Sequence, residues 1–168
     1  FSSLEIKRAI DREVNTEGLL MMGVDLAWGG GDESVAIVRQ GNKVLTLERW
    51  MFRLEDSILS VQKIIDLIQR YNVKNVNLDA VSGGSPIYSE LTQRGYKVNP
   101  IIAGEKANDS ERYVNQRAEM YYHLQKRFRE NTISIPNDRD LVDQLASIKY
   151  GIASEKRIQL ISKEYMRK

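Results

Sequence analysis

The stretch that decides the fold is Met21–Val38, which reads MMGVDLAWGGGDESVAIV. Two apolar segments flank a glycine-rich turn, which predicts β-strands over Leu19–Ala27 and Ser34–Arg39 with the turn at Trp28–Glu33. The first strand is apolar on both faces apart from one carboxylate, Asp25, as is typical of a central strand. Because burial of an unpaired carboxylate is costly, we expect a cation beside Asp25.

The composition narrows the kind of metal site that the chain can build. Its 168 residues suit one domain with a real core, and they include no cysteine and a single histidine, His123. Disulfides, thiolate zinc sites, cysteine nucleophiles and His-rich metal sites are therefore excluded. A metal must be held mainly by carboxylates, which favours Mg²⁺ or Mn²⁺. The net charge of +2 says little about nucleic acid, so local clusters of basic residues carry that question.

The elements after the turn predict a mixed sheet. A tight turn at Gln40–Asn42 leads to a third strand over Lys43–Trp50, which completes a three-strand antiparallel meander. Apolar residues at steps of three and four predict a helix over Ser57–Tyr71, and a short strand follows over Asn75–Asp79. A helix between two strands favours a right-handed crossover, which places this fourth strand parallel to the first.

The remainder of the chain predicts further helices and strands. We expect a helix over Ile87–Arg94, a strand over Lys97–Ile102, a polar and mobile segment over Ala103–Arg112, helices over Tyr113–Glu130 and Asn137–Ile148, and a hairpin over Tyr150–Ser162. The stripe of Met120, Tyr121, Leu124 and Phe128 is expected to lie in the core. This order of elements predicts an α/β, ribonuclease H-like fold with a mixed central sheet, a three-strand antiparallel meander plus parallel strands, flanked by helices.

That order makes the first and fourth strands neighbours and so brings two aspartates together. Asp25 lies near the carboxyl end of the first strand and Asp79 ends the fourth. Two like charges at contact distance repel each other unless a cation lies between them. Two shared Mg²⁺ or Mn²⁺ ions would relieve the repulsion and position a phosphodiester for attack by water. The plainer alternatives are that Asp25 caps the turn, that Asp79 forms a turn, and that Asp32 is a hairpin residue rather than an auxiliary metal ligand.

Several motifs in order resemble one known family. They are GVDLA at 23–27 with GGDES at 30–34, LDA at 78–80 with Gly83 and Gly84, NQRAEM at 115–120, and IQL at 158–160 with Lys163 and Glu164. Together they look like the C-terminal nuclease domain of a tailed-bacteriophage terminase large subunit. The resemblance runs from about Gly18 onward.

The resemblance implies a Mg²⁺- or Mn²⁺-dependent endodeoxyribonuclease domain that cuts concatemeric DNA during viral genome packaging. It implies Asp25 and Asp79, with Asp32 as a possible auxiliary, as the metal-binding and catalytic carboxylates. The implied partners are double-stranded DNA, an upstream ATPase domain, the small terminase subunit and the portal protein, with no membrane, in the cytoplasm of an infected bacterium.

The same resemblance predicts how the sequence is divided. Residues 1–17 would be a linker or helix from an upstream ATPase domain, and residues 18–168 a nuclease domain truncated at its C-terminus. The family's third metal-binding aspartate lies beyond the motif that Lys163 and Glu164 resemble, so we expect weak activity from this fragment. Asp109, Glu105 and Glu119 are the carboxylates that would partly substitute.

DNA contacts are expected from Lys106, Arg112 and Arg117, which belong to a dense basic region, and from the glycines Gly83 and Gly84. A basic helix face is often simply solvated, and Arg117 has an ion pair with Glu119 as its alternative. Three other functions stay open. They are a non-catalytic DNA-gripping or docking module, a resolvase-like enzyme of the same fold, and a relative of the actin-like ATPases, whose first phosphate loop the GVDLA segment also resembles.

Overall fold

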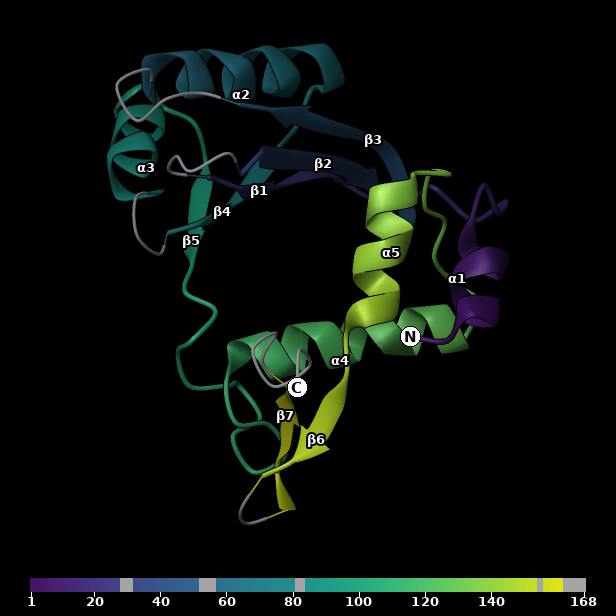
Figure 1. Cartoon of the computed structure of the whole chain (residues 1–168). Helices are drawn as coiled ribbons and strands as arrows, with labels where there is room; N and C mark the ends of the chain where they lie inside the picture. Colours follow the sequence, from purple (N-terminus) through teal and green to yellow (C-terminus); the bar gives the residue numbers. More distant parts are fainter. Residues whose placement is uncertain (28–31, 52–56, 81–83, 154–155, 162–168) are drawn as a thin grey trace. The chain divides into compact units, whose positions relative to one another are not determined.

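The computed structural model describes residues 1–27, 32–51, 57–80, 84–153 and 156–161 (Figure 1). The chain forms two compact units. The sheet unit is Asn15–Ile102, and the helical unit combines Phe1–Val14 with Ala103–Lys168. Over the described ranges, no helix has the length and apolar character needed to cross a membrane.

The sheet unit is built on five strands in the order β3-β2-β1-β4-β5. They are β1 (Leu20–Asp25), β2 (Ser34–Gln40), β3 (Lys43–Trp50), β4 (Asn75–Asp79) and β5 (Val98–Ile101). The first three form the predicted antiparallel meander, and β4 runs parallel to both β1 and β5. The α/β fold class, with its mixed central sheet, is therefore confirmed.

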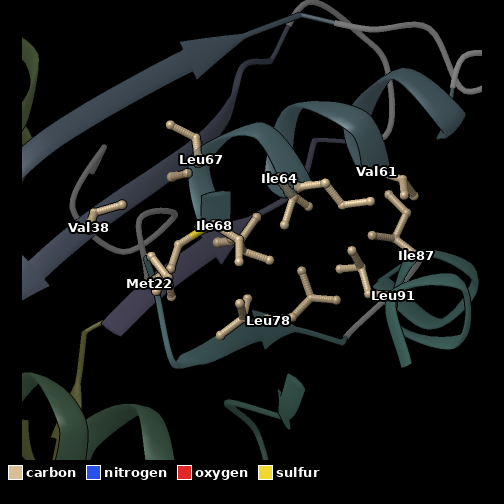
Figure 2. Packing of buried hydrophobic residues seen from close by; sticks show 14 of the residues in the cluster. Met22, Val38, Val61, Ile64, Leu67, Ile68, Leu78, Ile87 and Leu91 are labelled. Atoms are coloured by element: carbon tan, nitrogen blue, oxygen red, sulfur yellow. The ribbon is translucent and has the colours of Figure 1, made fainter. Parts of the chain in front are cut away.

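Two helices cover one face of this sheet. Helix α2 (Ser57–Tyr71) is the predicted crossover between β3 and β4, and α3 (Gly84–Gln93) connects β4 to β5. Figure 2 shows the buried side chains between the helices and the strands, including Met22, Val38 and Leu78 of the strands and Ile64 and Leu91 of the helices. Each such side chain contributes about 1.5–3 kcal/mol when it is fully buried, so this cluster is the main source of the unit's stability.

Strand β1 differs from the prediction that both of its faces are buried. Met22 and Val24 are buried in the cluster with α2, whereas Gly23 and Asp25 are exposed. The reason is the alternation of a strand, which sends successive side chains to opposite faces, combined with α2 and α3 packing on one of those faces. Asp25 is therefore not a buried carboxylate, and the desolvation argument for a cation beside it is wrong.

Local turn chemistry is as predicted. Gly41 in the β2–β3 turn has φ +53°, and a Cβ added there would lie 2.6 Å from the backbone oxygen of Glu17. Gly95 has φ +85° after α3, and its N–H donates to the carbonyl of Thr92 at 2.9 Å. Both positions require a left-handed backbone, which glycine adopts without steric cost.

The helical unit contains three helices and a hairpin among its described residues: α1 (Ser3–Ala9), α4 (Gln116–Arg129), α5 (Arg139–Ser147), and β6 (Tyr150–Ile152) paired antiparallel with β7 (Ile158–Leu160). Ser2 and Glu5 form a reciprocal capping box that starts α1. The ring of Phe1 packs edge-on against Phe128 of α4 with centroids 5.2 Å apart. The first helix is therefore part of this unit's packing, while the domain boundary at residue 18 stays a prediction.

Two details of α4 correct the sequence prediction. The helix begins at Gln116 rather than Tyr113, because the Asn115 side chain caps it by accepting from the N–H of Ala118. Phe128 is buried as expected, but Met120 is 42% exposed and does not belong to the core of its unit.

Candidate functional site

Asp25 and Asp79 occupy neighbouring positions at the carboxyl ends of β1 and β4. The parallel register pairs Met22 with Val76 and Val24 with Leu78, so the next position on each strand is an aspartate. Val24 and Leu78 are both buried in the cluster beneath α2, and alternation therefore directs both aspartates to the opposite face. Asp25 is exposed and Asp79 half-buried. Adjacent strands lie about 4.8 Å apart, so the two side chains start from neighbouring points on one face.

A polar layer lies one step behind the two aspartates on the same face. There the register aligns Gly23, Asn77 and Asn99 across three strands. The side-chain amide of Asn99 donates to the Asn77 amide oxygen at 3.2 Å. A Cβ on Gly23 would meet no atom within 4 Å, so the surface beside Asn77 is open. Sequence reasoning missed Asn77, although its spacing of two residues from Asp79 places it on the same face.

An arginine flanks the aspartates on the other side. Val35 of β2 pairs with both Asp25 and Arg49, which puts Arg49 two strands away on the same face, at about 10 Å. The Arg49 Nε lies 3.8 Å from a carboxylate oxygen of Glu33. Arg49 was also missed, because only the β2–β3 register places it in this row. Its positive charge partly offsets the negative charge of the aspartates.

A cation is expected here because Asp25 and Asp79 carry like charges at adjacent positions, not because Asp25 is buried. Carboxylates at adjacent positions repel each other, and a divalent ion between them removes that repulsion. The donors also fit, since carboxylate oxygens are the ligands that Mg²⁺ and Mn²⁺ prefer. Within the described ranges, no group of three or more His, Cys, Asp or Glu side chains is placed to share a metal. Asp32 is exposed just before β2, and its auxiliary role stays a prediction.

The residues expected to contact DNA fall into two sets. Lys106, Arg112 and Arg117 belong to the helical unit and are exposed. Gly84 is the first residue of α3 in the sheet unit, and Gly83 lies outside the described residues. Their roles in DNA binding stay predictions.

The two arginines are held by aromatic rings. The guanidinium of Arg112 lies 5.5 Å from the ring centroid of Tyr113 and 5.8 Å from that of Tyr122. Arg117 lies 5.9 Å from the ring of Tyr121. Stacking of this kind orients an arginine and leaves the edge of its guanidinium available for a phosphate.

A cavity of about 200 Å³ lies between α4 and the β6–β7 hairpin. Its lining includes Tyr122, Gln125 and Tyr150. The Tyr150 hydroxyl is buried and has no hydrogen-bond partner among the described residues. Burial raises the pKa of Tyr150 to about 12. This cavity was not foreseen, since it depends on how the hairpin packs on the helix.

No family model and no curated protein matches the sequence. Solved structures do match over nearly its full length. A mutant nuclease domain of the large terminase subunit gp2 of bacterial virus Sf6, solved with manganese and beta-thujaplicinol, is 14% identical with a TM-score of 0.81, covering 99% of this chain and 89% of that one. The large terminase nuclease from thermophilic phage G20c with bound magnesium is 18% identical with a TM-score of 0.67, covering 94% and 85%.

A third structure gives the same picture. The large terminase nuclease domain of Thermus phage P74-26 is 16% identical with a TM-score of 0.68, covering 96% of this chain and 85% of that one. Identities this low establish the fold and not the activity. The resemblance seen in the sequence motifs is nonetheless confirmed at the level of structure. The chain has the ribonuclease H-like fold of the nuclease domains of phage large terminase subunits.

Proposed function

We propose that this chain is the metal-dependent DNA endonuclease domain of a phage terminase large subunit. The observation that carries the proposal is the placement of Asp25 and Asp79 at adjacent positions on one exposed sheet face. The fold is that of terminase nuclease domains, of which one was solved with manganese and another with magnesium.

In this proposal the two aspartates hold one or two Mg²⁺ or Mn²⁺ ions. When bound there, a divalent cation would supply Lewis-acid polarisation of a phosphoryl oxygen. The carboxylates fix its position, and the exposed face admits the DNA backbone. Asn77 and Asn99 present side-chain amides beside the pair, where they can orient a phosphate or a water molecule by hydrogen bonding. Lys106, Arg112 and Arg117 add sequence-independent contacts to phosphates.

The proposed setting follows from the same fold. The domain would act on double-stranded concatemeric DNA, downstream of an ATPase domain and together with a small terminase subunit and a portal protein. Its place of action would be the cytoplasm of the infected host cell. These partners are proposals that rest on what terminases do.

The test is Mn²⁺-dependent nicking of supercoiled plasmid, combined with electron paramagnetic resonance of Mn²⁺ to count bound ions. We expect the wild-type chain to nick plasmid in Mn²⁺ and to lose this activity in EDTA. Asp25→Asn and Asp79→Asn should each reduce both nicking and Mn²⁺ binding by at least about tenfold, since each removes a charged ligand. A wild-type chain that neither binds Mn²⁺ nor nicks plasmid, or an Asp25→Asn chain that nicks as well as wild type, refutes the proposal.

Asp66→Asn is the matched control. Asp66 is exposed on α2 and accepts a hydrogen bond from the Gln62 amide at 2.8 Å. Because α2 packs on the opposite face of the sheet, the same loss of charge there should leave nicking and Mn²⁺ binding unchanged.

A second candidate function is a non-catalytic DNA-gripping module. It is favoured by one observation: among the described residues, no three His, Cys, Asp or Glu side chains are placed to hold one metal ion together. The two candidates differ in Mn²⁺, where only the nuclease nicks plasmid and loses that activity on Asp25→Asn. A gripping module would bind DNA equally well in EDTA and after Asp25→Asn and would not nick plasmid in Mn²⁺.

A further inference from the structure

The segment Ala103–Asp109, here called the Lys106 loop, was predicted to be mobile but is tied to α4 along its length. The carbonyl of Ala103 accepts from the N–H of Arg117 at 2.9 Å, and the carbonyl of Glu105 accepts from the N–H of Gln116 at 2.9 Å. These two bonds use free N–H groups in the first turn of the helix, which have no partner within the helix itself. The first half of the loop is therefore fixed by the helix start.

A buried carboxylate holds the second half. One oxygen of Glu119 accepts from the N–H of Asn108 at 2.7 Å, and the other accepts from the N–H of Asp109 at 3.3 Å. Glu119 is only 8% exposed, although His123 Nε2 approaches one of its oxygens at 3.9 Å. A carboxylate that accepts from two consecutive backbone N–H groups fixes the local chain direction more strongly than a neutral acceptor does. The carboxylate therefore holds the loop and does not form the alternative ion pair with Arg117.

The result is a loop whose backbone is held on both sides of one exposed cation. Ala107 is 4% exposed and packs with Tyr113 and Ala118 beneath the loop. Lys106 stands between the bound carbonyl of Glu105 and this buried methyl group, and its side chain is exposed. Across the described part of the chain no ion pair engages Lys106. A lysine on a fixed backbone loses less conformational entropy when it binds a phosphate than one on a loose loop does.

We propose that Glu119 is a positioning residue for DNA binding, acting through Lys106. The Glu119 carboxylate orders the Lys106 loop, and the loop in turn presents Lys106 to a backbone phosphate. This inference rests on the proposed function, because it takes DNA as the ligand. It goes beyond that function by assigning a role to a buried carboxylate whose two oxygens accept hydrogen bonds from the backbone of the loop.

The test combines two variants of Glu119 with Lys106→Ala. Glu119→Gln keeps one acceptor oxygen and Glu119→Ala keeps none, while both residues are compatible with a helix. We expect the amides of Asn108 and Asp109 to exchange hydrogen faster in the order Glu, Gln, Ala, with at least about a tenfold increase in the alanine variant. DNA affinity, measured by fluorescence anisotropy on a short duplex in EDTA, should weaken in the same order.

The salt dependence separates positioning from general loosening. Loss of one lysine–phosphate contact lowers the slope of log affinity against log salt by about one. Lys106→Ala and Glu119→Ala should each lower the slope by this amount, and the double variant should lower it no further. Additive effects in the double variant would show that Glu119 acts by another route and would overturn the inference.

Glu111→Gln is the matched control for charge. Glu111 is exposed and lies two residues after the Lys106 loop, so its replacement removes an acid without releasing the loop. It should leave the exchange of Asn108 and the salt slope unchanged. A wild-type chain that binds no DNA would refute the proposed function together with this inference. Normal DNA binding by wild type with unaltered binding in Glu119→Ala would refute the inference alone.

Discussion

Replacing Asp25 by asparagine should make the chain more stable than wild type when no metal is present. With a divalent metal bound, the same variant should be less stable than wild type. Adjacent register positions make the Asp25 and Asp79 side chains start about 4.8 Å apart on neighbouring strands. Two unit charges at that distance repel by about 0.8 kcal/mol in bulk water and by about 3 kcal/mol at an effective dielectric of 20. Because Asp25 is exposed, the lower end applies, and we expect Asp25→Asn to gain about 1 kcal/mol in EDTA at low salt.

The expected shift is measurable by thermal unfolding. For a chain of 168 residues, 1 kcal/mol corresponds to a change in Tm of about 2–4 °C. In Mn²⁺ at ten times its dissociation constant, wild type gains about 1.4 kcal/mol by linkage, whereas a variant that does not bind the ion gains nothing. The order of the two Tm values should therefore reverse between EDTA and Mn²⁺.

The control is Asp66→Asn, which removes the same charge from the opposite face and should show no reversal. High salt provides a second check, since screening should shrink the EDTA difference. An Asp25→Asn chain that melts below wild type in EDTA, with equal Mn²⁺ stabilisation of both proteins, would refute the electrostatic reasoning.

Three further predictions concern stability. Leu78→Ala, at a fully buried position, should lower the free energy of unfolding by about 2–5 kcal/mol in urea titration, whereas Leu45→Ala, at a position 39% exposed, should cost much less. The indole N–H of Trp50 donates to the buried hydroxyl of Ser60 at 3.2 Å. Ser60→Ala should therefore lower the free energy of unfolding by about 1–3 kcal/mol, because it leaves that donor unpaired. In a chain that also carries Trp50→Phe the donor is absent, and the same substitution should cost less. Because burial raises the pKa of Tyr150 to about 12, its neutral form is favoured in the folded state, and stability should fall as pH rises from about 10 to about 12. Ultraviolet absorbance of tyrosinate, compared with Tyr150→Phe, would detect this late ionisation, and an ionisation near pH 10 would contradict it.

Much of the sheet unit could be predicted from local patterns. The meander, the crossover helix and the short strand ending at Asp79 all follow from periodicity and turn residues, which act over a few neighbours. A right-handed crossover makes β4 parallel to β1, and the ribonuclease H-like order of elements makes the two strands neighbours, so the pairing of Asp25 with Asp79 could be expected from the amino-acid sequence. Asn77 could have been added by the same alternation.

The sequence by itself determined the mixed sheet and the neighbouring positions of Asp25 and Asp79, because alternation and turns are encoded locally and the order of elements along the chain sets the order of the strands. Only the tertiary structure decided that Asp25 is exposed, since the apolar run of β1 does not reveal that α2 and α3 cover one face. Only the tertiary structure ordered the Lys106 loop, because its hydrogen bonds reach a glutamate ten residues or more further along the chain. Packing between residues far apart in the sequence determines both the exposure of Asp25 and the order of the Lys106 loop, so neither can be predicted from the residues that flank Asp25 or Lys106.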